Sequence, residues 1–425
     1  MSQTIQIETV NDDYTDGPAA DTLIWQADQP ATTAPLDDQE SVDYAAIVAH
    51  CDQLLQQQPD AAEVWQDKGS ALIHLGHHAD AIACFEHAIA LQPDSPQAHY
   101  SLAWTAYVSG QYELAIRSCQ QVLALDAEFP NAACILGQAL YATGQYQEAI
   151  DVLQQVVQNQ PDCLDAWYCQ GFALFATGQY EETIGVLRHV LEARPDCADA
   201  WFCQGFALHA TGRHEGAVSH FNHALELRSD YQEALVGRGD ALRDLGDHEA
   251  AMASYDKALH LQPENAEVWY QWALCLKQLN RPQEAITGYD NTLKYQPNHA
   301  GAWYGRGSAY MKLGDFQNAI ASYTKALELN PRWFEAWFNQ GVAFKNLGQF
   351  EQSVKSYDRA LALQPKDHRA WNNRGGVLVS LERYEDAIAS YDKVLAINPK
   401  DTKAQQNRTA LVNLLKRRQS AQSSN

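Results

Sequence analysis

A proline that recurs at a spacing of 34 residues, or twice 34, constrains this chain more than any other feature. It stands at Pro59, Pro93, Pro161, Pro195, Pro263, Pro297, Pro331, Pro365 and Pro399. The two skipped positions hold Ala127 and Ser229 within otherwise matching sequence. Ten repeats therefore run from 59 to 399 without an insertion or deletion. A fixed period of this length predicts stacked repeats that share one continuous core, rather than separate globular domains.

Four further columns keep the same step, with the proline position counted as offset zero. Offset six holds Trp65, Trp167, Trp201, Trp269, Trp303, Trp337 and Trp371. Offset ten holds Gly69, Gly137, Gly171, Gly205, Gly239, Gly307, Gly341 and Gly375, with Ala103 and Ala273 as substitutes. Offset seventeen holds Gly76, Gly110, Gly144, Gly178, Gly212, Gly246, Gly314 and Gly348, and offset twenty-two is usually alanine.

These columns predict two helices in each repeat. Apolar residues on both sides of offset seventeen recur at three- and four-residue steps, which is helical periodicity. The glycine at offset seventeen ends the first helix and turns the chain, and the proline ends the second helix. The acidic residue after the proline is expected to cap the next helix, as at Asp60, Asp94, Asp162 and Asp196. Small residues at offsets ten and twenty-two should let the paired helices approach closely.

The pattern W-x-x-x-G…G…A…P over residues 59–399 resembles the tetratricopeptide repeat family. The segments YDRALALQP and YDKVLAINP are similar to bacterial members, cyanobacterial ones especially, several of which assist the assembly of membrane complexes. The resemblance implies an all-α fold, a right-handed superhelical solenoid of about ten helix–turn–helix repeats with capping helices. Residues 41–58 are predicted as the N-terminal capping helix and residues 400–417 as the C-terminal one. Residues 1–40, which are acidic without a basic residue, and residues 418–425 are predicted to be disordered.

The charge of the chain argues against a nucleic-acid partner, because phosphate binding needs clustered lysine and arginine. The formal net charge is −23. Residues 1–240 hold 34 acidic and 7 basic residues, whereas residues 241–425 hold 19 acidic and 23 basic ones. No segment has the roughly 20 apolar residues of a membrane helix, so no direct membrane insertion is expected. The N-terminus lacks the pattern of a signal peptide, and nine cysteines without a CxxC pair predict reduced thiols in the cytoplasm.

The family resemblance implies an inner groove lined by the first helix of each repeat. If offsets six and ten face the paired helix, offsets seven, eleven and fourteen share the opposite face. In the early repeats these offsets are aromatic: Tyr100, Tyr168 and Phe202 at seven, Trp104, Phe172 and Phe206 at eleven, and Tyr107, Tyr141 and Phe175 at fourteen. Offsets seven and fourteen have an alternative interpretation as ordinary packing. Offset eleven is usually polar in the family, so its three aromatics predict an exposed binding patch.

The later repeats offer a different chemistry on the same face. Offset fourteen holds Arg243, Lys277 and Lys345, and offset eight holds Asn339, Asn373 and Asn407. An asparagine ladder can hydrogen-bond an extended peptide backbone through both amide atoms. The alternative is that asparagine is simply frequent at this offset in the family. The lysines stand in the wrong column for the clamp that some members use to hold a C-terminal carboxylate.

The sequence therefore predicts a binding protein and not an enzyme. We expect a protein–protein interaction scaffold, a chaperone-like adaptor or an assembly factor, which binds segments of client proteins or peptides in the groove. The alternative is a regulatory subunit that controls a separate enzyme through the convex face, with the acidic tail autoinhibitory through Leu23, Ile24 and Trp25. Histidines near turns are expected to be solvated, so no metal site is predicted. No serine, cysteine or carboxylate pair stands apart from the repeat pattern, so no catalytic residue and no cofactor are predicted. Self-association stays open.

Overall fold

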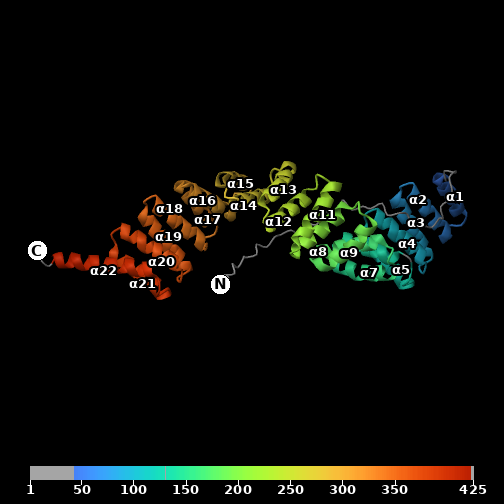
Figure 1. Ribbon diagram of the computed structural model, residues 1–425. Helices are drawn as coiled ribbons and strands as arrows, with labels where there is room; N and C mark the ends of the chain where they lie inside the picture. The colour runs from blue at the N-terminus through green and yellow to red at the C-terminus, as the bar shows by residue number, and fades with distance from the viewer. Residues whose placement is uncertain (1–42, 130, 423–425) are drawn as a thin grey trace. The chain divides into compact units, whose positions relative to one another are not determined.

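The computed structural model describes residues 43–129 and 131–422, which form 22 α-helices and no β-strand. The chain divides into two compact units, residues 1–229 and 230–425. We call them the N-terminal unit, which contains α1–α11, and the C-terminal unit, which contains α12–α22 (Figure 1). Each unit is an all-α solenoid of helix–turn–helix repeats, as the 34-residue period predicted.

Even-numbered helices are the first helices of the repeats, and odd-numbered ones are the second helices. In the N-terminal unit the bounds are α1 Tyr44–Gln57, α2 Ala62–His74, α3 His78–Leu91, α4 Pro96–Val108, α5 Tyr112–Leu125, α6 Ala132–Ala142, α7 Tyr146–Asn159, α8 Leu164–Ala176, α9 Tyr180–Ala193, α10 Ala198–Ala210 and α11 His214–Leu227. The helix α6 has 11 residues, fewer than its neighbours, because Asn131 before it adopts a left-handed φ of +62°. A left-handed residue cannot itself be a member of a right-handed helix, so α6 begins only at Ala132.

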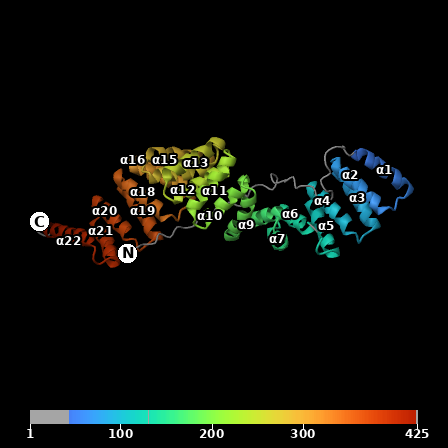
Figure 2. The same ribbon diagram turned by 45° about the vertical axis from the view of Figure 1, so that its right-hand side comes forward.

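The C-terminal unit repeats the same alternation in five further pairs and a final helix. The bounds are α12 Gln232–Asp244, α13 His248–Leu261, α14 Ala266–Gln278, α15 Pro282–Tyr295, α16 Ala300–Leu313, α17 Phe316–Leu329, α18 Phe334–Asn346, α19 Phe350–Leu363, α20 His368–Ser380, α21 Tyr384–Ile397 and α22 Thr402–Gln422. Within either unit, each helix packs against the next in chain order, as the ribbons in Figures 1 and 2 also show.

The turn glycines at offset seventeen act as predicted. All eight have a positive φ, between 71° and 85°, a conformation that costs glycine nothing because it has no Cβ. At Gly178, the glycine N–H donates to the carbonyl of Phe175 at 3.0 Å, and the next N–H donates back to Leu174 at 2.9 Å. This pair of bonds satisfies carbonyls at the end of α8 and reverses the chain into α9. Two repeats have no glycine here, and Asn280 and Glu382 adopt the same left-handed conformation at φ +57°.

The predicted capping aspartates are wrong by one residue. The helices that follow Asp60, Asp94, Asp162 and Asp196 are capped instead by Ala61, Ser95, Cys163 and Cys197. Of these four caps, only Ser95 accepts a side-chain hydrogen bond, from the Ala98 N–H at 3.3 Å. The reason is geometric, since the proline and the aspartate both belong to the turn and the first helix starts at offset three. The capping position is therefore offset two.

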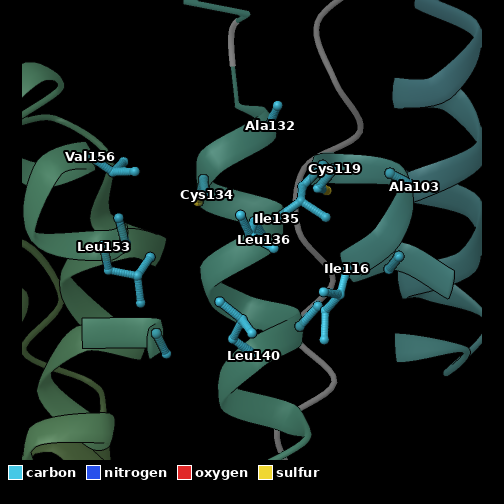
Figure 3. Close-up of a cluster of buried hydrophobic side chains, with 14 of the residues drawn as sticks. Ala103, Ile116, Cys119, Ala132, Cys134, Ile135, Leu136, Leu140, Leu153 and Val156 are labelled. Carbon is cyan, nitrogen blue, oxygen red and sulfur yellow. The ribbon is translucent and has the colours of Figure 1, made fainter. Parts of the chain in front are cut away.

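Close packing between the two helices of a repeat depends on the glycines at offset ten. A Cβ built on Gly171 would lie 2.3 Å from Leu187 Cδ2, and one on Gly239 would lie 2.4 Å from Tyr255 Cε1. The large side chain sixteen residues later thus fills the place of the missing Cβ, which confirms the predicted close approach. The same principle builds the core around α6, where Ile135, Leu136 and Leu140 lie among side chains of α5 and α7 (Figure 3).

Both predicted capping helices are present. The first, α1, packs on α2. The last, α22, packs on α21, but the prediction that the chain is disordered from residue 418 is wrong, because α22 continues to Gln422. No glycine or proline follows Pro399, and the lysine, arginine, glutamine and alanine there favour a helix. The Arg418 guanidinium also lies over the Tyr384 ring at 4.9 Å, which holds this end against α21. The acidic segment 1–40 lies outside the described residues.

Candidate binding face

The first helices of each unit lie closer to one another than the second helices do. In the N-terminal unit α2, α4, α6, α8 and α10 contact successively, and in the C-terminal unit α12, α14, α16, α18 and α20 do the same. The second helices make their main contacts with first helices instead. In a two-layered array, the more closely spaced layer is the inner one. The first helices therefore form the inner layer within each unit. Their side chains that point away from the second helices define the candidate binding face.

Aromatics at offset seven are largely covered by the next repeat. The residue at offset two of the following repeat packs on them, as Phe129 does on Tyr100 with ring centroids 5.0 Å apart. His299 covers Tyr270 in the same way at 4.4 Å, and Trp333 covers Tyr304 at 4.5 Å. Tyr100, Tyr168 and Phe202 are each only 7% exposed. These three residues therefore fit the alternative interpretation, in which offset seven packs between repeats, better than a position on the wall of the groove.

The three aromatics at offset eleven do not form one exposed patch. Phe172 is 1% exposed and belongs to the core, so the prediction that it faces the groove is wrong. Its ring packs on Tyr168, one helical turn earlier, at 4.4 Å, and α8 is surrounded by α6, α7, α9 and α10. Trp104 and Phe206 are half-buried and keep part of their surface in solvent.

The aromatics at offset fourteen are also half-buried, and each packs on the tyrosine that begins the second helix of its repeat. The ring centroids are 5.9 Å apart for Tyr107 and Tyr112, 5.5 Å for Tyr141 and Tyr146, and 6.3 Å for Phe175 and Tyr180. Burial raises the pKa of the Tyr107 and Tyr141 hydroxyls. These rings are therefore held rigidly, with only part of each ring accessible.

Contacts between offsets eleven and fourteen join four of these rings in two pairs. Phe175 meets Phe206 of the next repeat edge-on at 5.3 Å, and Trp104 lies 6.3 Å from Tyr107. We call the half-buried set Trp104, Tyr107, Tyr141, Phe175 and Phe206 the aromatic wall. All five stand on α4, α6, α8 and α10, which contact successively in the N-terminal unit. Rigid, partly exposed aromatic side chains are the commonest anchors in protein interfaces.

In the C-terminal unit, Arg243 belongs to a polar network. Its guanidinium lies 3.1 Å from the Asp240 carboxylate and 3.0 Å from that of Asp244, and it donates to Gln271 at 2.5 Å. The Tyr255 hydroxyl also donates to Asp240 at 2.7 Å. Burial raises the pKa of Asp240 to about 6, against the opposing effects of Arg243 and Tyr255. Because two carboxylates surround Arg243, it serves the packing of α12 more directly than the capture of an anionic ligand.

The other predicted polar residues divide into exposed cations and engaged amides. Lys277 and Lys345 are exposed. The Asn339 amide donates to the Tyr304 hydroxyl at 3.0 Å, so one of its two N–H donors is used within the fold. Burial raises the pKa of Tyr391, and the hydrogen bond with Asn407 opposes this rise. Burial likewise raises the pKa of Tyr357, and the hydrogen bond with Asn373 opposes it. The asparagine ladder thus borders buried or half-buried tyrosines rather than standing free in solvent.

Sequence reasoning missed a column of ion pairs at offset nine. Arg306 lies 2.7 Å from Asp290, Arg374 lies 2.6 Å from Asp358, and Arg408 pairs with Asp392. In each case the acid stands sixteen residues earlier, on the second helix of the preceding repeat. A basic residue recurring at offset nine with an acid at this spacing was the available signal. Part of the positive charge of the late repeats is therefore neutralised locally.

Within each unit considered separately, no three histidine, cysteine, aspartate or glutamate side chains of the described residues lie close enough together to bind one metal ion. None of the helices in 43–129 and 131–422 is long and apolar enough to span a membrane.

Comparison with known families finds repeat sequences along the chain. Profiles described as tetratricopeptide repeat match residues 39–100, 173–232, 267–299, 300–332 and 338–402, and one described as TPR repeat matches 239–280. Together they span more than half of the chain. A profile described as anaphase-promoting complex, cyclosome, subunit 3 matches residues 74–154 and 109–190. No curated protein matches the chain.

Several solved structures are similar to this chain. The C-terminal part of a TPR repeat-containing protein from Cytophaga hutchinsonii is 16% identical, with a TM-score of 0.50, and the match covers 56% of this chain and 97% of that one. YrrB, described as a TPR protein with an unusual peptide-binding site, is 22% identical over 46% of this chain and 97% of its own, with a TM-score of 0.41. The Cut9–Hcn1 hetero-tetramer of the APC/C matches at 13% identity over 87% of this chain and 93% of that chain, with a TM-score of 0.39.

Proposed function

Because the chain belongs to the tetratricopeptide repeat family, we propose that it is a protein-interaction scaffold or assembly factor that binds client polypeptide segments. The binding site that we assign is the aromatic wall on the first helices of the N-terminal unit. The single observation that carries this assignment is the row of half-buried rings from Trp104 to Phe206. Such a row offers apolar contact area at a low cost in side-chain entropy, because its rings are already held in place.

The chemistry of the wall and its surroundings defines the client. The 34 acidic residues against 7 basic ones in residues 1–240 favour a partner with positive charge. A segment with aromatic or aliphatic anchors flanked by lysine or arginine fits both features. The YrrB description supports peptide binding by this kind of fold without identifying the peptide. Exposed Lys277 and Lys345 are assigned as secondary contacts in the C-terminal unit.

We also propose that the protein is not an enzyme and that it acts in the cytoplasm. Tetratricopeptide repeats serve recognition, and all nine cysteines are free thiols, which is typical of a reducing compartment. A regulatory role through the second helices is the competing function. The experiment below separates it from binding at the aromatic wall.

The test uses full-length protein and a displayed library of random twelve-residue peptides. Selected peptides are expected to be rich in aromatic or aliphatic residues and in lysine or arginine. Their affinities are then measured by fluorescence anisotropy for wild type and for the double variant Trp104→Ser/Phe206→Ser. Two truncated anchors should weaken binding at least about tenfold, which corresponds to about 1.4 kcal/mol.

The matched control is Leu125→Ser, which removes a side chain that is 41% exposed on the second helix α5. It should leave the affinity unchanged. Circular dichroism of each variant verifies that its helix content equals that of wild type. If the selected peptides bind the double variant as tightly as wild type but lose affinity for Leu125→Ser, the assignment to the aromatic wall is wrong and the second-helix face is favoured.

A further inference from the structure

The contact between offset seven of one repeat and offset two of the next joins two aromatic rings in three places, at Tyr100 and Phe129, Tyr270 and His299, and Tyr304 and Trp333, but in the third repeat it joins two thiols. Cys134 occupies offset seven on α6, and Cys163 occupies offset two, where it caps α8. Their Sγ atoms lie 3.6 Å apart. The stacking that brings Phe129 onto Tyr100 in the preceding pair of repeats therefore brings these two sulfurs together across 29 positions of sequence. Figure 3 shows Cys134 on α6 beside the core residues of that helix.

The two thiols differ in environment. Cys134 is 6% exposed, whereas Cys163 is half-buried and reaches solvent. The hydrogen bond from Cys134 lowers the pKa of Cys163 to about 7, and the backbone N–H groups of Ala166 and Asp165 at the start of α8 add to this effect. A thiolate at a helix N-terminus is the form that reacts with oxidants and alkylating agents. Cys163 is therefore suited to react first and Cys134 to resolve the product.

We propose that Cys134 and Cys163 form an oxidisable pair, which closes to an intramolecular disulfide when the protein meets hydrogen peroxide. The Cys163 thiolate attacks the peroxide, an S–O bond forms as the O–O bond breaks, and the hydroxide that leaves takes up a proton to become water. Cys134 then loses its proton and attacks the sulfenic sulfur, so that the S–S bond forms and the S–O bond breaks. The second hydroxide takes the Cys134 proton, and the two sulfurs have given two electrons to the peroxide.

The geometry suits this closure. The sulfurs need to approach from 3.6 Å to about 2.05 Å, and Cys163 is the N-cap residue that precedes the first turn of α8. The disulfide would tie α6 directly to the start of α8 across α7. Tyr141 on α6 and Phe175 on α8 belong to the aromatic wall, so oxidation would fix the spacing of two of its anchors. The reaction itself does not depend on the proposed binding function.

The next repeat provides a matched internal control. Cys197 caps α10 as Cys163 caps α8, but the residue at the position of Cys134 is Tyr168. Without a second thiol, burial raises the pKa of Cys197. The chain therefore contains the same helix-capping cysteine with and without a resolving partner.

The experiment treats full-length protein with hydrogen peroxide, blocks the remaining thiols and maps the disulfides by mass spectrometry. Residues 118–187 contain no lysine or arginine, so trypsin leaves both cysteines in one peptide. A protease that cleaves after glutamate separates them at Glu148. The expected product is a disulfide-linked pair of peptides that contain Cys134 and Cys163, with the loss of two of the nine thiols. Cys134→Ser and Cys163→Ser should abolish the linked pair, and Cys197→Ser should leave it unchanged.

A second measurement uses wild type alone, so it does not depend on whether the variants fold. Without oxidant at pH 7, iodoacetamide should alkylate Cys163 of wild type about tenfold or more faster than Cys197, because a larger fraction of it is thiolate. Peroxide oxidation that proceeds without a Cys134–Cys163 link, or that links other cysteines to the same extent, overturns the proposal. Equal alkylation rates for Cys163 and Cys197 overturn the assignment of Cys163 as the attacking thiol.

Discussion

Replacing Gly171 by valine tests the close approach of the two helices in a repeat. A Cβ on Gly171 of α8 would lie 2.3 Å from Cδ2 and 2.8 Å from Cγ of Leu187 on α9. Carbon atoms in contact are about 3.5–4.0 Å apart, so the added side chain and Leu187 cannot both keep their places. Leu187 is fully buried and cannot turn into solvent. The two helices must separate or the leucine must adopt a poor rotamer.

The magnitude follows from two opposing effects. Extra volume in a well-packed core costs about 1–3 kcal/mol. Valine favours a helix over glycine by a few tenths of a kcal/mol, which offsets a small part of this cost. We therefore expect Gly171→Val to lower the free energy of unfolding by about 1–2 kcal/mol.

Two further variants isolate the cause. Gly185 lies within α9, and a Cβ built there meets no atom within 4 Å, so Gly185→Ala should stabilise the protein by about 0.5–1 kcal/mol through helix propensity alone. In the second repeat the positions of Gly171 and Leu187 are occupied by Ala103 and Cys119, both fully buried. The double variant Gly171→Ala/Leu187→Cys copies that pair. Its loss of stability should be smaller than the sum of the two single losses.

Urea unfolding followed by circular dichroism at 222 nm measures these changes, and equal m-values verify that the extent of unfolding is the same. A midpoint for Gly171→Val equal to that of wild type would refute the explanation of the glycine column. A double variant whose loss equals the sum of the single losses would show that Gly171 and Leu187 do not compete for the same space.

Three other predictions follow from burial, ionisation and backbone conformation. Phe172→Ala should destabilise the protein by about 3–5 kcal/mol in urea unfolding, whereas Phe206→Ala, in the same column but half-buried, should cost clearly less. Burial raises the pKa of Asp240 to about 6, above its value near 3.9 in the unfolded chain. Between these two pH values the folded state binds more protons than the unfolded state, so the free energy of unfolding falls as pH rises from 4 to 6. Asp240→Asn should therefore lose less stability than wild type between pH 4 and pH 7, by at most about 3 kcal/mol, and an unchanged pH profile would contradict this assignment. Glu382→Gly should raise the thermal midpoint, because glycine removes roughly 1 kcal/mol of left-handed backbone strain at φ +57°, and a lower midpoint would contradict it.

Much of the local structure could be predicted because it depends on residues close in sequence. The period of 34 determined the number of repeats, and helical periodicity determined the two helices in each one. The glycines at offset seventeen were predictable for the same reason, since a left-handed turn favours a residue without a Cβ. The errors at helix ends were also local. The caps stand one residue later than expected, and α22 continues beyond residue 417 because nothing in its sequence stops it.

The candidate site depended instead on contacts between repeats. Phe172 and Phe206 share one offset and nearly the same surrounding sequence, yet Phe172 is buried in the core while Phe206 keeps part of its ring in solvent. Exposure is decided by which helices stack against a side chain, and a single repeat does not contain those helices. The pairing of Cys134 with Cys163 has the same origin. The sequence alone determined what each repeat is built from, and the tertiary structure decided which side chains of neighbouring repeats meet, because stacking joins residues about thirty positions apart.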